Sequence, residues 1–196
     1  MSVGGELATE QALFGAAPRH RAVLAAQREL LLVATAGTLL ATPLTDVDEV
    51  ARLPGGLTPV PGAPASLLGV LPWRGRVVPI IDLDRFLGAA SGQPDARRTL
   101  ILVPFEEATV GIVVDELVGA CRVPESAIVA APVPSGVATR LDCVGVLELA
   151  PERLDESSHV PPAVRERCRV PIVDLVETVR EVERAMPERF PGAQGE

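Results

Sequence analysis

The residue types that most often carry out chemistry in proteins are few in this chain and widely spaced. The two histidines, His20 and His159, lie in an arginine-rich stretch and in a Ser/Pro-rich stretch. Both are expected to be solvated surface side chains and not a metal-binding pair. The H-E-x-x-H, G-x-S-x-G and G-x-G-x-x-G motifs are all absent from the sequence. The sequence therefore predicts no catalytic residue, no metal site and no cofactor.

The three cysteines, Cys121, Cys143 and Cys168, are too few for a disulfide scaffold and form no C-x-x-C pair. An odd number of this kind is typical of a reducing compartment. Each cysteine lies in or beside a β-rich segment, where a buried and inert thiol is expected. A Cys168–His159 nucleophile remains conceivable and would make the protein a small hydrolase.

An acidic cluster, Asp46, Asp48 and Glu49, follows Thr45. Three carboxylates within four positions of a helix do not share one face, which argues against a cation site. Thr45 is a suitable helix N-cap, and the helix dipole favours acidic residues in the first turn. The cluster is therefore interpreted as the start of a short helix that ends near Leu53.

Trp73 stands beside Arg74-Gly75, a predicted turn. Tryptophan and arginine are the residue types that most often anchor protein interfaces. The segment is therefore a candidate contact surface, although packing of Trp73 over its own lobe explains that residue equally well.

The composition excludes several function classes. The 196 residues include 18 Arg but no Lys, and 26 Asp and Glu, which gives a net charge of −8. The absence of lysine excludes Schiff-base and phosphate-loop lysine chemistry. A negative chain with dispersed arginines lacks the basic stripe that nucleic-acid binding requires. No signal peptide or spanning segment is recognised, so a soluble cytoplasmic protein is expected.

Short apolar runs separated by turn residues predict a mainly β protein. A helix is expected over residues 18–29 and an amphipathic helix after residue 175, with Leu175, Val179, Val182 and Met186 on one face. A loop is expected over 89–96 and a polar surface excursion over 151–167. The predicted strands cover residues 30–36, 39–44, 66–73, 76–82, 98–105, 109–119, 139–150 and 169–175.

One internal echo suggests two similar lobes. VPIIDL (78–83) and VPIVDL (170–175) differ at one position, and each combines an apolar strand with an Asp suited to cap a following helix. The echo falls at the end of each half of the chain. It predicts two β lobes, each closed by a short helix.

The run GVLPWRGRVVPIIDLDRFLG (69–88) resembles the CheW family of chemotaxis coupling proteins. The similarity extends over LTDVDEVARLP (44–54), VPGAPASLLGV (60–70), VGIVVDELVG (110–119) and RVPIVDLVETV (169–179), in the family's order. As a set, these motifs cover the chain from about Glu29 to Val182.

The resemblance implies two intertwined SH3-like, five-stranded β-barrel lobes around a shared apolar core, with an N-terminal and a C-terminal helix. The implied organisation is an extension (1–28), a CheW-like domain (29–182) and a C-terminal helix end and tail (183–196). Within the domain, lobes of about 29–97 and 98–182 and a polar insertion at 151–168 are expected.

The resemblance also implies the binding residues. Val47, Glu49, Arg74 and Gly75 match positions on the receptor-binding side, where Glu49 and Arg74 are expected to lie near each other. The kinase or ring side is expected to include Val77, Val78, Pro79, Val113 and Val114.

The function implied by the resemblance is that of a non-enzymatic adaptor in a two-component signalling system. It would couple the cytoplasmic tip of a methyl-accepting chemoreceptor to the regulatory domain of a CheA-type histidine kinase. Such a protein is cytoplasmic, is recruited to membrane arrays through its partners, and binds neither nucleic acid nor the membrane directly. An adaptor in a divergent pathway, such as type IV pilus motility, and a small-ligand sensor with its site between the lobes are the alternatives.

Overall fold

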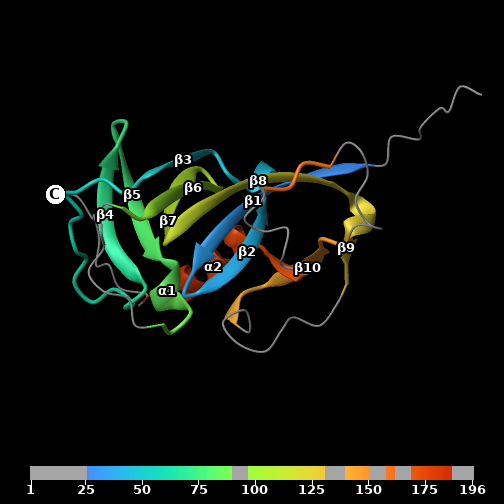
Figure 1. The fold of residues 1–196 in the computed structure, drawn as a ribbon. Helices are drawn as coiled ribbons and strands as arrows, with labels where there is room; N and C mark the ends of the chain where they lie inside the picture. Colours follow the sequence, from blue (N-terminus) through green and yellow to red (C-terminus); the bar gives the residue numbers. More distant parts are fainter. Residues whose placement is uncertain (1–25, 90–96, 131–139, 151–157, 162–168, 187–196) are drawn as a thin grey trace, which may run out of the picture.

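A computed structural model describes residues 26–89, 97–130, 140–150, 158–161 and 169–186 (Figure 1). Most of these residues form β-strands in two sheets, as the alternating short apolar runs predict. The elements are β1 (Gln27–Thr35), β2 (Thr38–Pro43), η1 (Leu44–Asp46), β3 (Glu49–Arg52), β4 (Leu67–Trp73), β5 (Arg76–Asp82), α1 (Leu83–Phe86), β6 (Thr99–Phe105), β7 (Ala108–Val114), β8 (Glu116–Pro124), η2 (Glu125–Ala127), β9 (Ile128–Val129), β10 (Cys143–Glu148), β11 (Arg169–Val173) and α2 (Leu175–Arg184).

The two sheets define two lobes. Lobe A is the sheet with strand order β8-β1-β2-β11-β10-β9, and lobe B is the sheet with order β3-β6-β7-β5-β4. Most neighbouring strands are antiparallel, but β5 runs parallel to β7 and β11 runs parallel to β2. The lobes are therefore built on the same plan, which confirms the predicted fold of two SH3-like β lobes. Lobe B has the predicted five strands, whereas lobe A has six.

The lobes exchange strands along the chain. The β1–β2 hairpin pairs with β8 and β11 of the second half, whereas β6 and β7 join β3, β4 and β5 of the first half. The predicted division into lobes of residues 29–97 and 98–182 is therefore wrong, although the lobes are intertwined as expected. Local sequence does not reveal which hairpin completes which sheet, because that choice is made by long-range pairing.

The internal echo corresponds to the repeated structural unit. Asp82 ends β5 and accepts hydrogen bonds from the backbone N–H groups of Asp84 and Arg85 at the start of α1. Asp174 follows β11 and accepts one from the N–H of Glu177 in α2. The strand before each of β5 and β11 is bulged at a glycine, Gly69 in β4 and Gly145 in β10.

Three clusters of buried apolar residues form the core. One fills lobe A, one fills lobe B, and the largest lies between the lobes. The central cluster combines Leu31 and Leu40 of lobe A, Ile101 and Ile112 of lobe B, and the buried face of α2. Figure 1 shows α2 lying between the two sheets, so the lobes share an apolar core as predicted. The predicted apolar face of α2 is correct, since Leu175, Val179 and Val182 are buried and Met186 is half-buried.

Two helix predictions need correction. The helix expected over 18–29 falls largely outside the described residues, but its last residues, Gln27–Glu29, belong to β1. The acidic helix expected from Thr45 is only one 3-10 turn, η1, and Glu49 begins strand β3. Strand pairing replaces the helix because the edge of β6 is available, and the N–H of Asp48 already donates to the carbonyl of Leu102 over 2.9 Å.

Two further expectations are partly wrong. The strand predicted over 109–119 is broken at Asp115, where the chain crosses from β7 in lobe B to β8 in lobe A. Within the polar excursion, His159 pairs with Arg122 of β8, and Val160 is buried in lobe A. The excursion is thus not entirely a surface loop; residues 151–157 and 162–168, like most of the loop expected at 89–96, lie outside the described residues. No helix in the described part of the chain is long and apolar enough to cross a membrane.

Candidate partner-binding site

The turn between β4 and β5 presents Arg74 at the tip of a hairpin. Arg74 and Gly75 both have positive φ values, 46° and 80°, which suit a two-residue hairpin turn. The hairpin projects from lobe B in Figure 1. An arginine in this left-handed conformation is uncommon, so the backbone here is held by the strand pairing on either side.

Arg74 contacts the carboxylate that begins β3. Its Nη2 donates a hydrogen bond to Oε1 of Glu49 over 2.6 Å, although the two residues are 25 positions apart. The side chain of Arg74 is 73% exposed and that of Glu49 is 29% exposed. The expected proximity of Glu49 and Arg74 is confirmed. Such an exposed pair adds about 0–1 kcal/mol to stability, so it is not needed to hold the fold together.

A surface hollow of about 440 Å³ surrounds this pair. Val78 and Leu102 provide buried apolar surface, and Trp73 packs against the lobe B core. Trp73 is thus partly a packing residue, and its buried indole Nε1 has no hydrogen-bond partner among the described residues. The polar lining consists of the acids Asp48 and Glu49, the bases Arg74 and Arg76, and the neutral Thr109.

The other residues expected on the receptor side are sequence neighbours of residues that line this hollow. Gly75 shares the hairpin tip with Arg74, and a Cβ added to it would meet nothing within 4 Å. Val47 precedes β3 and is half-buried against the core between the lobes.

The residues expected on the kinase side do not form one surface. Val77 is 71% exposed and Pro79 is half-buried, so both can contact a partner. Val78, Val113 and Val114 are core residues with at most 2% exposure. The prediction that these three side chains contact a partner is therefore wrong. Alternation along β5 explains the difference, because successive side chains of a strand point to opposite faces.

A second hollow, of about 710 Å³, lies at the junction of the lobes and was not predicted. Val50 lines it from β3, next to Glu49, and Asp115 and Leu117 line it where β7 passes into β8. Leu117 is one of three large apolar side chains exposed among the described residues, with Val77 and Val144. Strand alternation at β3 would have indicated Val50, but the helix predicted there concealed that signal.

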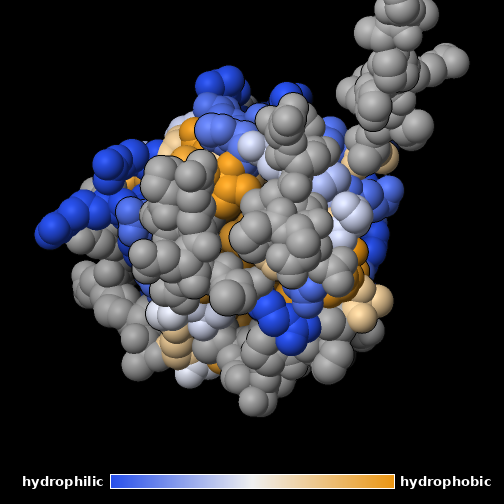
Figure 2. All heavy atoms as spheres, turned by 45° about the vertical axis from the view of Figure 1, so that its right-hand side comes forward, coloured by the Kyte–Doolittle hydropathy of each residue, from blue (hydrophilic) through white to orange (hydrophobic). Residues whose placement is uncertain are grey.

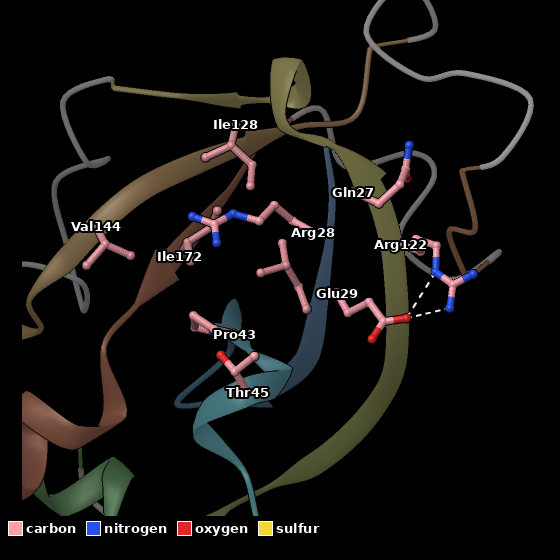
Figure 3. A pocket seen from close by; sticks show the side chains of 10 residues that line it. Gln27, Arg28, Glu29, Pro43, Thr45, Arg122, Ile128, Val144 and Ile172 are labelled. Carbon is pink, nitrogen blue, oxygen red and sulfur yellow. Dashed lines mark hydrogen bonds and ion pairs between the residues drawn. The ribbon is translucent and has the colours of Figure 1, made fainter. Parts of the chain in front are cut away.

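A third hollow, of about 500 Å³, opens in lobe A (Figure 3). Arg28 extends across it beside Ile172, and Val144, which is 58% exposed, stands at its edge. At the opposite edge Arg122 donates hydrogen bonds to the carboxylate of Glu29. On the face shown in Figure 2, hydrophobic atoms are visible close to hydrophilic side chains.

Cys121, Cys143 and His159, which the structure describes, do not line any of these three hollows. Burial raises the pKa of Cys121 to about 11, and burial also raises the pKa of Cys143. Cys121 is a free thiol and is buried in lobe A, as predicted for a structural cysteine. His159 is exposed, as expected, whereas Cys168 and His20 lie outside the described residues. No group of three or more metal-ligating side chains occurs within the described ranges.

Two intertwined β lobes with surface hollows, a projecting hairpin and an exposed charged pair define a protein with features suited to binding other proteins. The chain belongs to the CheW-like domain family, whose family model matches residues 29–158.

Similar proteins agree with this assignment. Protein FrzA of Myxococcus xanthus is 34% identical over 109 residues, 56% of this chain and 67% of its own length. The chemotaxis protein CheW of Rhizobium meliloti is 41% identical over 30% of this chain and 37% of its own length. Protein PilI of Pseudomonas aeruginosa is 33% identical over 45% of this chain and 49% of its own length. The chain thus spans between about one third and two thirds of these relatives.

A solved structure shows the same fold. The scaffolding protein TtCheW from Thermoanaerobacter tengcongensis superposes with a TM-score of 0.59, covering 76% of this chain and 90% of its own. Its sequence identity of 19% supports the fold alone.

Proposed function

We propose that this protein is a non-enzymatic adaptor that couples a chemoreceptor to a CheA-type histidine kinase. The receptor partner is the cytoplasmic tip of a methyl-accepting protein, and the kinase partner is its regulatory domain. The adaptor works in the cytoplasm and reaches membrane arrays only through these partners. Membership of the CheW-like family supports the proposal, as does the similarity to a protein named chemotaxis protein CheW.

The observation that carries the receptor side is the contact between Glu49 and Arg74. Both side chains reach solvent and form a hydrogen bond of 2.6 Å at a hollow whose lining is partly polar and partly apolar. An exposed charged pair contributes little to folding but can orient a partner, while apolar surface beside it supplies affinity. Val77, exposed on the same hairpin, and Pro79 are assigned to the kinase side.

Reversal of one charge tests this proposal. Arg74→Glu removes the contact and places two carboxylates side by side, so receptor-dependent kinase activation is expected to fall at least about tenfold, equivalent to about 1.4 kcal/mol. The melting temperature should change little, because the pair is exposed. The measurement is kinase autophosphorylation with purified receptor fragment, kinase and adaptor from one organism.

Two further variants make the result specific. Glu49→Arg added to Arg74→Glu restores opposite charges and should recover part of the activation. Arg122→Glu disrupts an equivalent exposed pair with Glu29 in lobe A and should leave receptor binding intact. A folded Arg74→Glu protein that activates the kinase fully would refute the assignment of this site.

The second candidate is an adaptor of the same kind in another receptor–kinase pathway, such as type IV pilus motility. The similarity to proteins named FrzA and PilI supports keeping it. Capture of partners from the native cell distinguishes the two, because the receptor and kinase recovered identify the pathway.

A further inference from the structure

A buried arginine holds together segments from several parts of the fold. Arg98 immediately precedes β6 and is 8% exposed. Its Nη1 donates to Oδ2 of Asp82 over 2.9 Å, and its Nη2 donates to Oδ2 of Asp84 over 2.8 Å. Its Nε lies 3.4 Å from Oδ1 of Asp115. Arg98 and these three aspartates form what we call the Arg98 cluster.

The Arg98 cluster also binds the turn between β1 and β2, which belongs to lobe A. The hydroxyl of Thr35 donates to Oδ1 of Asp84. The backbone N–H of Ala36 is shared between two carboxylates: it donates to Oδ1 of Asp84 over 2.9 Å and to Oδ2 of Asp115 over 3.1 Å. Asp84 lies in α1 and Asp115 where β7 crosses into β8, so the cluster connects the two lobes.

The ion pairs within the Arg98 cluster, together with the one that Asp82 makes with Arg85, contain one more acidic than basic side chain. Arg98 and Arg85, whose Nε lies 3.5 Å from Oδ2 of Asp82, supply two positive charges against the three aspartates. Asp115 is the most weakly compensated of the three. Its side chain is 47% exposed, against 0% for Asp82 and 9% for Asp84, and its contact with Arg98 is the longest.

The surroundings of Asp115 raise its pKa. Partial burial has the largest effect, followed by the hydrogen bond and charge of Asp84; the charge of Arg98 and the N–H of Ala36 lower the pKa without cancelling the rise. A hydrogen bond between two carboxyl groups needs a proton on one of them. Arg52, Arg97 and Glu116 line the same hollow as Asp115, and Arg52 donates to the carbonyl of Arg97 over 3.2 Å.

We propose that the strength of the connection between the lobes depends on the protonation state of Asp115. Protonated Asp115 donates a hydrogen bond to Asp84 and closes the Arg98 cluster. Ionised Asp115 repels Asp84 and loosens the turn at Ala36 from lobe B. Because Asp115 and Leu117 line the hollow at the lobe junction, the protonation state of Asp115 also sets the shape of that surface.

The sign of the effect follows from linkage. The folded protein binds the proton of Asp115 more tightly than the unfolded chain, because the folded pKa is raised. The stabilising contribution is therefore complete below the unfolded pKa and is lost as the pH rises through the folded pKa. Replacement of the carboxylate by an amide should retain the protonated arrangement at every pH.

The first experiment compares melting curves of wild type, Asp115→Asn and Glu116→Gln from acidic to neutral pH. Glu116→Gln changes the net charge by the same amount at the adjacent exposed position, so it controls for general charge effects. At neutral pH, Asp115→Asn is expected to melt about 2–4 °C above wild type, and the difference should vanish at acidic pH. Glu116→Gln should follow wild type.

The second experiment needs no destabilising variant. The amide signal of Ala36 in the wild-type NMR spectrum should shift with pH, with a midpoint above the pKa of an aspartate in an unfolded chain, and should become constant in Asp115→Asn. An Asp115→Asn protein that is less stable than wild type at all pH values would overturn the proposal. An Ala36 amide that does not respond to pH would do the same. Both measurements use the purified protein alone, so their outcome is independent of the proposed adaptor function.

Discussion

Two glycines at matching places in the lobes have unequal roles. Gly69 in β4 and Gly145 in β10 both occupy the bulge opposite the repeated V-P-I strand. Gly69 has φ +145°, and a Cβ on it would lie 2.3 Å from the carbonyl oxygen of Thr58. A Cβ on Gly145 would lie 3.1 Å from a methyl group of Ile128, which can move. Of the two positions, only that of Gly69 requires a glycine, because the backbone of Thr58 leaves no room for a Cβ.

Gly69→Ala should therefore destabilise the protein far more than Gly145→Ala. The new methyl group must displace the Thr58 backbone, which exchanges two hydrogen bonds with Val70 of 2.9 and 2.8 Å. A loss of about 3 kcal/mol or more is expected for Gly69→Ala, and about 1 kcal/mol for Gly145→Ala. Urea denaturation of both variants measures these losses, and equal values would refute the comparison.

At this scale the sequence predicts contacts only where a motif supplies them. The proximity of Glu49 and Arg74 followed from the family pattern, and the structure confirms it. The Arg98 cluster had no such signal, because Asp82, Arg98 and Asp115 are far apart in the chain and resemble ordinary helix caps and turn residues. They come together only because β5 and β6 both pair with β7.

At the scale of elements, the aspartate that caps the helix makes more interactions in one repeat than in the other. Asp174 is half-buried and caps α2 through the N–H of Glu177 over 3.0 Å. Asp82 is fully buried, caps α1 and also compensates the buried Arg98. The repeat VPI-x-DL thus encodes a strand, a cap and a helix in both lobes, but only lobe B couples the cap to a buried cation.

The two caps give a matched pair of variants. Asp174→Ala removes a single cap and should cost about 1 kcal/mol of unfolding free energy. Asp82→Ala also leaves Arg98 in the interior without one of its partners, and should cost about 3–5 kcal/mol. Chemical denaturation monitored by circular dichroism provides both values. Similar costs would mean that the contact between Asp82 and Arg98 adds nothing to stability.

Element predictions failed where strand pairing competed with local preference. Thr45 and the acids after it have the pattern of a helix start, yet Val47 and Glu49 are extended, with Glu49 paired to Leu102 of β6. The helical pattern predicted the structure correctly where the apolar face of the helix packs against the core, as in α2. The conformation of a short segment beside an open sheet edge is determined by pairing with that edge. The local sequence does not show that such an edge is present.

At the scale of the whole molecule, the exchange of strands makes the two lobes one folding unit. Lobe A takes β1 and β2 from the first half of the chain, and lobe B takes β6 and β7 from the second. The largest core cluster contains residues from both lobes and from α2. Sequence reasoning predicted the shared core and the two-lobe plan, but a cut between residues 97 and 98 separates strands that the structure joins.

This architecture predicts that the two halves of the chain cannot fold separately. A fragment of residues 1–97 contains β3 without β6 and β5 without β7, and its β1–β2 hairpin lacks β8 and β11. A fragment of residues 98–196 has the complementary gaps. Each exposes unpaired edges and apolar faces, so neither alone should show a cooperative thermal transition or a dispersed NMR spectrum.

An equimolar mixture of the two fragments is expected to recover both signals, because the missing strands and the shared core are then supplied in trans. The intact chain measured under the same conditions is the reference. A cooperative transition from either fragment alone would show that a sequential lobe is stable after all. That result would mean that the interwoven pairing is not what holds the molecule together.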